Sequence, residues 1–216
     1  MMSQDEILTL FKERGALLQG HFKLTSGLHS DSYVQCAKLL QYACDADRLG
    51  AELARKFKDP SQEKPITAVV SPAIGGIILG YAIARPLGAR SLFAERVDGK
   101  FAFRRGFALA PGEQVIVAED VLTTGGSVRE IIALVEASGA QVAGIASLAD
   151  RSEMTLQFPA RKEALLRLPL VTYPPDNCPL CEQGLPLAKP GSRPEKELKA
   201  PGPRQNPGAC SLEPGA

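Results

Sequence analysis

Short apolar runs alternate with amphipathic stretches through the central part of the chain. The runs are rich in Val, Ile and Ala, which is typical of strands that are buried on both faces of a sheet. They cover residues 66–71, 91–94, 115–118, 141–148 and 165–171. The stretches with helical spacing cover residues 45–58, 77–87 and 128–135. This alternation predicts an open α/β sheet flanked by helices.

The N-terminal residues 1–40 show a different pattern. Ser3 and Glu6 form a capping box, and apolar residues at helical spacing up to Leu18 predict a helix that ends within residues 15–20. Residues 21–34 then alternate apolar and polar positions around a Ser-Gly turn, which predicts a β-hairpin.

The C-terminal residues 186–216 differ in composition from the rest. They contain seven Pro and four Gly with scattered charges. Such a segment buries too little apolar surface to offset its chain entropy, so we expect it to be largely disordered. The sequence therefore predicts one domain over residues 1–185, with residues 1–40 as a small separate part, followed by a tail.

The overall composition fits one globular domain and excludes several classes of protein. The chain has 216 residues, 44% hydrophobic and 23% charged, with a net charge of +1. This near-zero charge gives no electrostatic reason to expect nucleic acid or an anionic membrane surface as a partner. No apolar run is long enough to span a bilayer and no leader is recognisable, so we expect a cytoplasmic protein.

The five cysteines are an odd number in a domain that is large enough to fold without disulfides, so reduced thiols are expected. Only Cys178 and Cys181 have a spacing that suits a metal. A zinc site needs about four ligands, and no second pair of cysteines or histidines lies nearby in the sequence. We therefore expect a simple loop there and no metal site made by protein ligands. His21 and His29, in the predicted hairpin, are expected to be solvated.

The run 115–118 ends in a group of residues that carry chemistry. Glu119 and Asp120 follow the strand, a loop of Thr, Gly and Ser comes next, and a helix follows the loop. Adjacent glycines let backbone N–H groups turn inward, and the start of a helix adds further unpaired N–H groups. This combination favours a bound phosphate. The carboxylates are better suited to sugar hydroxyls, or to a magnesium ion that accompanies the phosphate.

The stretch V-I-V-A-E-D-V-L-T-T-G-G-S, residues 115–127, resembles the phosphoribosyl-diphosphate (PRPP) motif of the type I phosphoribosyltransferases. The resemblance implies a mainly parallel α/β sheet with an N-terminal hood over residues 1–40. It also assigns a set of residues to PRPP. They are Glu119, Asp120, Val121, Leu122, Thr123, Thr124, Gly125, Gly126 and Ser127.

Three further segments resemble orotate phosphoribosyltransferases in particular. Residues 22–30 resemble the hood motif F-x-L-x-S-G-x-x-S, with Tyr33 and Val34 expected to shape the base pocket. Arg151 matches an arginine that grips the orotate carboxylate, beside Thr123. The basic hairpin around Asp98-Gly99 matches the mobile catalytic loop, in a shorter form that lacks histidine. This match makes Lys100 the expected catalytic lysine, with Arg96 also on pyrophosphate and Asp120 as the catalytic carboxylate.

A second loop, Pro72-Ala73-Ile74-Gly75-Gly76, follows the strand 66–71 and matches the pyrophosphate loop of the family. Gly75 stands where orotate enzymes commonly have lysine, so a contact from this position would have to come from the backbone.

The resemblance implies transfer of phosphoribosyl from PRPP to orotate, giving orotidine 5′-phosphate and pyrophosphate in pyrimidine (UMP) biosynthesis. It further implies Mg²⁺ held mainly by PRPP and water, and a homodimer whose loop completes the neighbour's site. Two alternatives stay open from the sequence. One is a phosphoribosyltransferase for a purine base, which would leave Arg151 and the hood motif unexplained. The other is a non-catalytic regulator that binds PRPP as a signal.

Overall fold

The structure is a computed structural model that describes residues 2–24, 26–58, 64–169 and 171–190. Within these residues, a six-stranded sheet has the strand order β5-β4-β3-β6-β7-β8. The strands are β3 (Ile66–Pro72), β4 (Arg90–Val97), β5 (Lys100–Phe103), β6 (Gln114–Leu122), β7 (Gln141–Asp150) and β8 (Lys162–Arg167). All pairs are parallel except β4 with β5, an antiparallel hairpin at the edge. The predicted, mainly parallel α/β sheet is confirmed.

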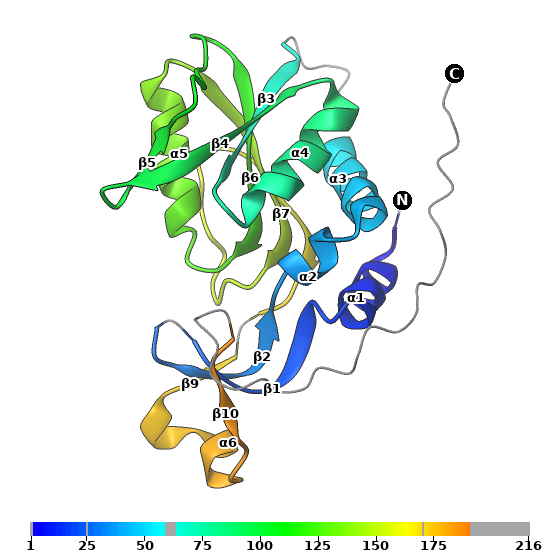
Figure 1. The fold of residues 1–216 in the computed structure, drawn as a ribbon, viewed down its shortest axis with the longest axis vertical. Coiled ribbons are helices and arrows are strands. Elements are labelled where there is room, and N and C mark those ends of the chain that lie inside the picture. Colours follow the sequence, from blue (N-terminus) through cyan, green and yellow to red (C-terminus); the bar gives the residue numbers. More distant parts are fainter. Residues whose placement is uncertain (1, 25, 59–63, 170, 191–216) are drawn as a thin grey trace.

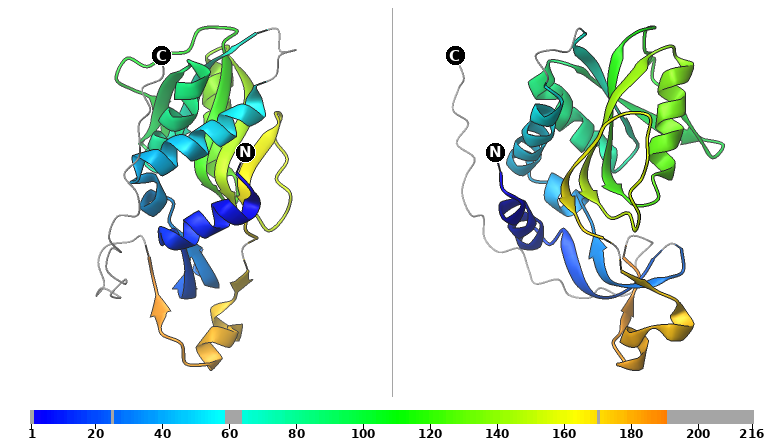
Figure 2. Two further views of the ribbon diagram at one scale, coloured as in Figure 1. Left: turned by 90° about the vertical axis from the view of Figure 1, so that its right-hand side faces the viewer. Right: turned by 180° about the vertical axis from the view of Figure 1, so that it is seen from behind.

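Helices cover both faces of this sheet (Figures 1 and 2). Helices α3 (Ala43–Phe57) and α4 (Gly76–Leu87) lie on one face, and α5 (Gly126–Ala137) lies on the other. Successive side chains of a strand point to opposite faces. In β6, accordingly, Val115 and Val117 pack in the cluster with α5, whereas Ile116 and Ala118 pack in the cluster with α3 and α4. Burial on both faces explains why the strands are continuous apolar runs.

The hood is built from both ends of the domain. Its sheet in the described residues has the order β10-β1-β2-β9, from β1 (Leu17–Lys23), β2 (His29–Val34), β9 (Thr172–Tyr173) and β10 (Leu187–Ala188). The short helices η1 (Pro175–Asn177) and α6 (Pro179–Glu182) connect β9 to β10. Figure 1 shows this small lobe below the main sheet, with α2 (Ala37–Leu40) leading from β2 toward α3.

The predicted N-terminal hairpin is confirmed as β1 and β2, but other predictions for the terminal regions need correction. Helix α1 (Gln4–Glu13) has the predicted capping box and ends earlier than expected. The left-handed Gly15 (φ 64°) stops it, so Leu17 and Leu18 belong to β1. Strand β8 begins and ends earlier than the predicted run 165–171. Within the predicted tail, β10 pairs with β1, whereas residues 191–216 lie outside the described part.

The prediction that the histidines are solvated is wrong. His21 is 4% exposed and His29 is 5% exposed, and both lie in the hood sheet. Cys36, Cys178 and Cys181 are free thiols. Cys44 is disulfide-bonded, so the expectation of reduced thiols is wrong for that residue. Among the described helices, every one is too short or too polar to cross a bilayer.

Close contact between α3 and α4 depends on a glycine. A Cβ atom added to Gly50 would lie 2.4 Å from the backbone oxygen of Ala82. Backbone atoms cannot move aside as a flexible side chain can, so this glycine fixes how closely the two helices pack.

We predict that Gly50→Ala lowers the free energy of unfolding by about 2–3 kcal/mol, because the helices must separate. Arg48→Ala is the matched control, since Arg48 lies on the exposed side of the same helix. Urea denaturation followed by circular dichroism measures both. Equal stability of the Gly50→Ala and Arg48→Ala proteins would show that the contact is not limiting.

Candidate active site

The strands place the candidate residues at one edge of the sheet. Because β3, β6 and β7 run parallel and pair with one another, their carboxyl ends meet there. Glu119 pairs with Ser147 and Leu122 pairs with Asp150 across β6 and β7. The sheet register therefore brings the acidic pair, the loop that follows it and Arg151 to the same edge.

The loop after β6 encloses a cavity of about 80 Å³ at the start of α5. Glu119 and residues 121–128 line it. Gly125 has φ 74°, a conformation that favours glycine, and a Cβ there would lie 3.0 Å from the Phe158 ring. The backbone thus turns directly into a helix of 12 residues. The start of a helix, whose first N–H groups have no partners within the helix, makes this cavity suitable for a phosphate.

Glu119 is held in an unusual electrostatic state. Burial, and secondarily the neighbouring charge of Asp120, raise the pKa of Glu119 to about 9. Its Oε2 atom is buried and has no hydrogen-bond partner in the described structure. Asp120 differs, because its Oδ1 accepts a hydrogen bond from the Val121 N–H at 3.0 Å. An unpaired carboxyl oxygen beside a second carboxylate suits a hydroxyl donor or a hydrated magnesium ion.

The second glycine loop lies against this acidic pair. A Cβ at Gly75 would lie 2.9 Å from Oδ2 of Asp120. A side chain at position 75 would therefore displace the Asp120 carboxylate or be displaced by it. The backbone of this loop is anchored by a hydrogen bond from the Ala73 N–H to the Ala94 oxygen, at 2.8 Å. The strand and loop predicted from residues 66–76 thus reach the same site.

Arg151 joins the sheet to the hood. It is only 4% exposed, and its Nη2 donates to Oγ (2.9 Å) and to the backbone oxygen (3.2 Å) of Ser32 in β2. Its Nε is buried with no partner among the described residues, and burial lowers the pKa of its guanidinium. Asp150 does not pair with it but binds Lys162 at 2.5 Å. Arg151 therefore does not form a surface ion pair with Asp150, and its Nε–H remains free to donate a hydrogen bond.

Tyr33 and Cys36, near the end of the hood hairpin, also lie close to the acidic pair. Tyr33 is half-buried, and burial, together with the charge of Asp120, raises the pKa of its hydroxyl. Val34, in contrast, is buried in the core beside α1 and α3. Cys36, which the sequence did not single out, places its Sγ 3.7 Å from the backbone oxygen of Asp120. Burial, and then Asp120, raise the pKa of this thiol well above its usual range.

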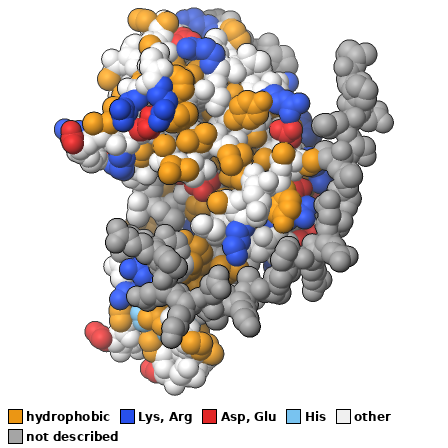
Figure 3. Space-filling model, viewed as in Figure 1, with side chains coloured by type: hydrophobic (Ala, Val, Ile, Leu, Met, Phe, Trp, Pro, Cys, Tyr) orange, Lys and Arg blue, Asp and Glu red, His pale blue; other side chains and the backbone are white. Residues whose placement is uncertain are grey.

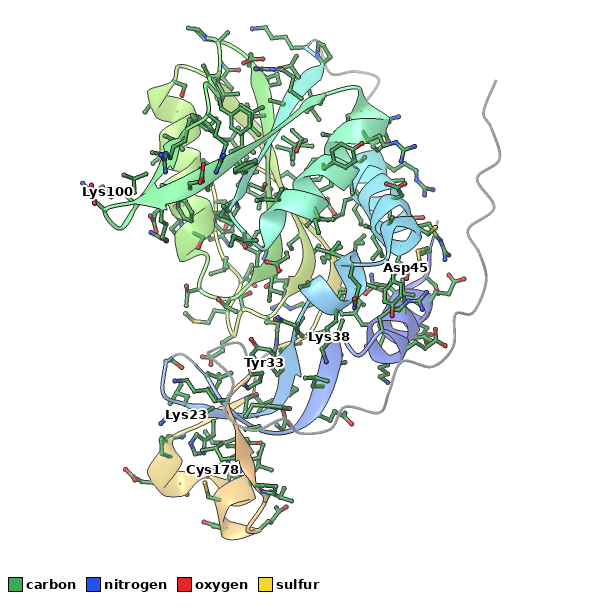
Figure 4. The ribbon with its side chains drawn as sticks, viewed as in Figure 1. Lys23, Tyr33, Lys38, Asp45, Lys100 and Cys178 are labelled. Atoms are coloured by element: carbon green, nitrogen blue, oxygen red, sulfur yellow. The ribbon has the colours of Figure 1, made fainter. Side chains whose placement is uncertain are left out.

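The predicted Asp98-Gly99 hairpin is confirmed as the turn between β4 and β5. Two cations of this hairpin differ in their contacts: Arg96 is held by a carboxylate, whereas Lys100 is exposed. Arg96 makes two hydrogen bonds to Glu130 of α5, at 2.9 and 3.0 Å, and lies over the Phe101 ring. Lys100 is exposed, and Figure 4 shows it at the outer tip of the hairpin, pointing away from Tyr33 and the hood. Within one chain, Lys100 therefore does not lie beside Glu119 and Asp120.

Comparison with known proteins identifies the family. The phosphoribosyl transferase domain matches residues 45–158. The chain is 50% identical over 192 residues to an orotate phosphoribosyltransferase of Desulforamulus reducens, covering 89% of this chain and 98% of that protein. It is 51% identical to an orotate phosphoribosyltransferase of Chlorobaculum parvum, again over 89% of this chain and 97% of that one. The chain belongs to the orotate phosphoribosyltransferase family.

A solved orotate phosphoribosyltransferase from Aeropyrum pernix shares the fold, with a TM-score of 0.57 at 24% identity, over 75% of this chain and 93% of that chain. The type I phosphoribosyltransferase fold that the sequence predicted is thus confirmed. The similarity to the Desulforamulus reducens protein extends over 192 residues and is therefore longer than the phosphoribosyl transferase domain match at residues 45–158. The roles of the individual site residues remain predictions.

The raised pKa of Glu119 predicts a pH dependence of stability. In the unfolded chain Glu119 ionises near its ordinary value of 4.5, but in the folded protein it stays protonated up to about 9. The folded state therefore holds a proton that the unfolded state loses, and stability falls as pH rises from about 5 to 9. The Glu119→Gln protein has no ionisable group at this position. Between pH 5 and 8, its free energy of unfolding should therefore fall by at least about 1 kcal/mol less than that of the natural protein.

Urea denaturation at both pH values measures this difference. Glu163→Gln is the control, since Glu163 is a partly exposed carboxylate of β8 at the surface. Parallel pH profiles of the Glu119→Gln and natural proteins would mean that Glu119 ionises normally.

Proposed function

We propose that this protein transfers the phosphoribosyl group of PRPP to orotate, releasing pyrophosphate and forming orotidine 5′-phosphate. The observation that carries the proposal is the buried guanidinium of Arg151, whose Nε lacks a partner within the described residues. Orotate differs from uracil by a carboxylate, and a guanidinium binds a carboxylate in a fork of two hydrogen bonds. The 50%-identical relatives carry the same activity in their names.

PRPP would be held mainly by backbone. We assign its 5′-phosphate to the N–H groups of Thr124, Gly125, Gly126 and Ser127, around the cavity at the start of α5. Val121 and Leu122 line the same cavity below the sugar. Pyrophosphate would extend toward the backbone of the Gly75 loop, which lies against Asp120. Thr123 would contact orotate together with Arg151.

The acidic pair would act on the sugar. Glu119 and Asp120 would bind the ribose hydroxyls, and the negative charge of Asp120 would favour the positive charge that develops at the anomeric carbon. Magnesium bound to PRPP would neutralise pyrophosphate charge. The unpaired Oε2 of Glu119 and the Asp120 carboxylate are the groups that would meet its bound water. In this proposal, the protein lowers the reaction barrier by positioning the substrates and by stabilising the charges that develop in the transition state.

A homodimer would complete the site. Ile74, in the loop before α4, and Ile78 and Tyr81, on α4, are exposed apolar residues with exposed fractions of 85%, 47% and 60%. Figure 3 shows hydrophobic side chains gathered on the face that α4 presents. A second copy of this chain is the occupant we propose, because Lys100 points away from its own acidic pair and could serve a neighbour's pyrophosphate, with Arg96 released from Glu130. We place this dimer in the cytoplasm.

A purine-specific enzyme is the alternative that shares the PRPP loop. It would have no use for a buried cation in the base pocket, and it is disfavoured for that reason. A PRPP-binding regulator would need no unpaired guanidinium either. An assay with PRPP, magnesium and a panel of orotate, uracil, adenine and hypoxanthine tests the proposal. Pyrophosphate release with orotate alone is expected, and turnover of a purine would contradict it.

Arg151→Ala should lower kcat/KM for orotate by an amount equivalent to about 2–4 kcal/mol of transition-state stabilisation, because the carboxylate would be desolvated without a partner. Arg151→Lys, which keeps the charge without the fork, should lose less. The Kd for PRPP should change little in both proteins, since its phosphates are held elsewhere. If PRPP binding collapsed while orotate kinetics survived, Arg151 would not be the orotate anchor.

Lys100→Ala and Asp120→Asn should each reduce kcat at least about 10-fold, or about 1.4 kcal/mol of barrier. If the hairpin acts across the dimer, mixing the two inactive proteins creates some dimers with one intact site. Activity should then recover to about a quarter of the natural level, on a statistical mixture. No recovery after verified subunit exchange would show that Lys100 serves its own subunit.

A further inference from the structure

Four side chains with metal-binding atoms converge in the hood. His21 lies on β1 and His29 begins β2, while Cys178 precedes α6 and Cys181 lies in that helix. One nitrogen or sulfur atom from each lies within 4.8 Å of all the others. Figure 4 shows Cys178 in the small lobe, on the far side of Tyr33 from the main sheet. This cluster is separate from the phosphate loop and the acidic pair.

The distances fit a tetrahedral metal. Zinc binds sulfur at about 2.3 Å and histidine nitrogen at about 2.0–2.1 Å, so a tetrahedron has S···N edges of about 3.5 Å. The observed S···N distances are 3.6 Å (Cys178 to His21), 3.7 Å (Cys181 to His21) and 3.4 Å (Cys181 to His29). The two nitrogens, His21 Nε2 and His29 Nδ1, are 2.9 Å apart and need to separate only slightly.

The orientation of His21 supports the same conclusion. Its Nδ1 lies 2.9 Å from the backbone oxygen of Leu185. A carbonyl oxygen only accepts, so Nδ1 carries the hydrogen and Nε2 is left with a lone pair that points into the cluster. Metal-binding histidines are commonly fixed in this way, with the second nitrogen donating to a carbonyl.

The local backbone of the cysteines is also suitable. The Cys181 N–H donates to the Cys178 oxygen at 3.0 Å, which curls the Cys-Pro-Leu-Cys segment so that both sulfur atoms point the same way. Cys178 is 1% exposed, and both histidines are buried. Two sulfurs and two imidazoles select zinc over magnesium or calcium, which prefer oxygen ligands.

We propose that His21, His29, Cys178 and Cys181 bind one structural zinc ion. Four protein ligands leave no open coordination position, which is the arrangement of structural rather than catalytic zinc sites. The proposal also corrects the expectation that Cys178 and Cys181 have no histidine pair nearby. That pair is distant in sequence and adjacent in space.

The zinc would fasten the C-terminal segment to the N-terminal hairpin. His21 lies opposite Leu187 of β10, and His29 lies opposite Tyr173 of β9. Strands β9 and β10 have two residues each, and α6 has four, so their own hydrogen bonds and burial give little stability. A metal that bridges both segments stabilises them together.

Metal analysis of the full chain, expressed without a histidine tag and purified without chelator, tests the proposal. Mass spectrometry of the elements should find about one zinc per chain, and Cys178→Ser with Cys181→Ser should reduce this to below about a tenth. Cys36→Ala is the matched control, because it removes a buried free thiol outside the cluster. Its zinc content should be unchanged. Full zinc in the double variant would overturn the proposal.

A second measurement uses the natural protein, in case the double variant folds poorly. Replacing zinc by cobalt(II) should give the visible absorption of tetrahedral cobalt with thiolate ligands. Removal of zinc should lower Tm by at least roughly 4 °C, and added zinc should restore it. A protein with no zinc and no cobalt spectrum, or one with a Cys178–Cys181 disulfide by peptide mass, would overturn the proposal. Stoichiometric iron would overturn the choice of zinc.

Discussion

The buried guanidinium of Arg151 connects the main sheet to the hood. It emerges after β7 and binds Ser32 of β2 through Nη2. Removing a cation from water is costly unless its donors find partners, and Nε has none among the described residues. The ligand-free site therefore carries an electrostatic cost that an incoming carboxylate would offset. Burial and the neighbouring charge of Asp120 keep Glu119 protonated, which is a second electrostatic cost at the same edge of the sheet. Both costs lower the stability of the folded protein, which natural proteins tolerate at functional sites, and they agree with the proposed binding of charged substrates.

Much of the main domain could be predicted from the sequence because its signals are local. Strands buried on both faces are short apolar runs, and Asp98-Gly99 specifies a hairpin turn. The candidate phosphate loop could be predicted because adjacent glycines, acids and a helix start lie within thirteen residues. Even there the sequence did not show that Gly75 lies against Asp120, since that contact joins loops from two strands.

The hood was predicted less well, for the same physical reason. Its partners come from opposite ends of the chain, and pairing such as β1 with β10 has no local signature. Leu17 and Leu18 continued a helical apolar pattern, but the backbone at Gly15 ended the helix before them. The histidines appeared to be isolated polar residues, because their spacing from Cys178 and Cys181 follows no motif. Only the folded hood brings these four side chains together.

The position of the two histidines has a consequence for proton transfer. The chain has two histidines in total, and both belong to the cluster in the hood. The candidate catalytic edge therefore has no imidazole of its own, so a rate that changes near neutral pH could not be assigned to a histidine there. Glu119, with its pKa raised to about 9, is instead the carboxyl group closest to that range. An ionisation of the protein itself that appears between neutral and mildly alkaline pH would thus be tested first at Glu119, a carboxylic acid.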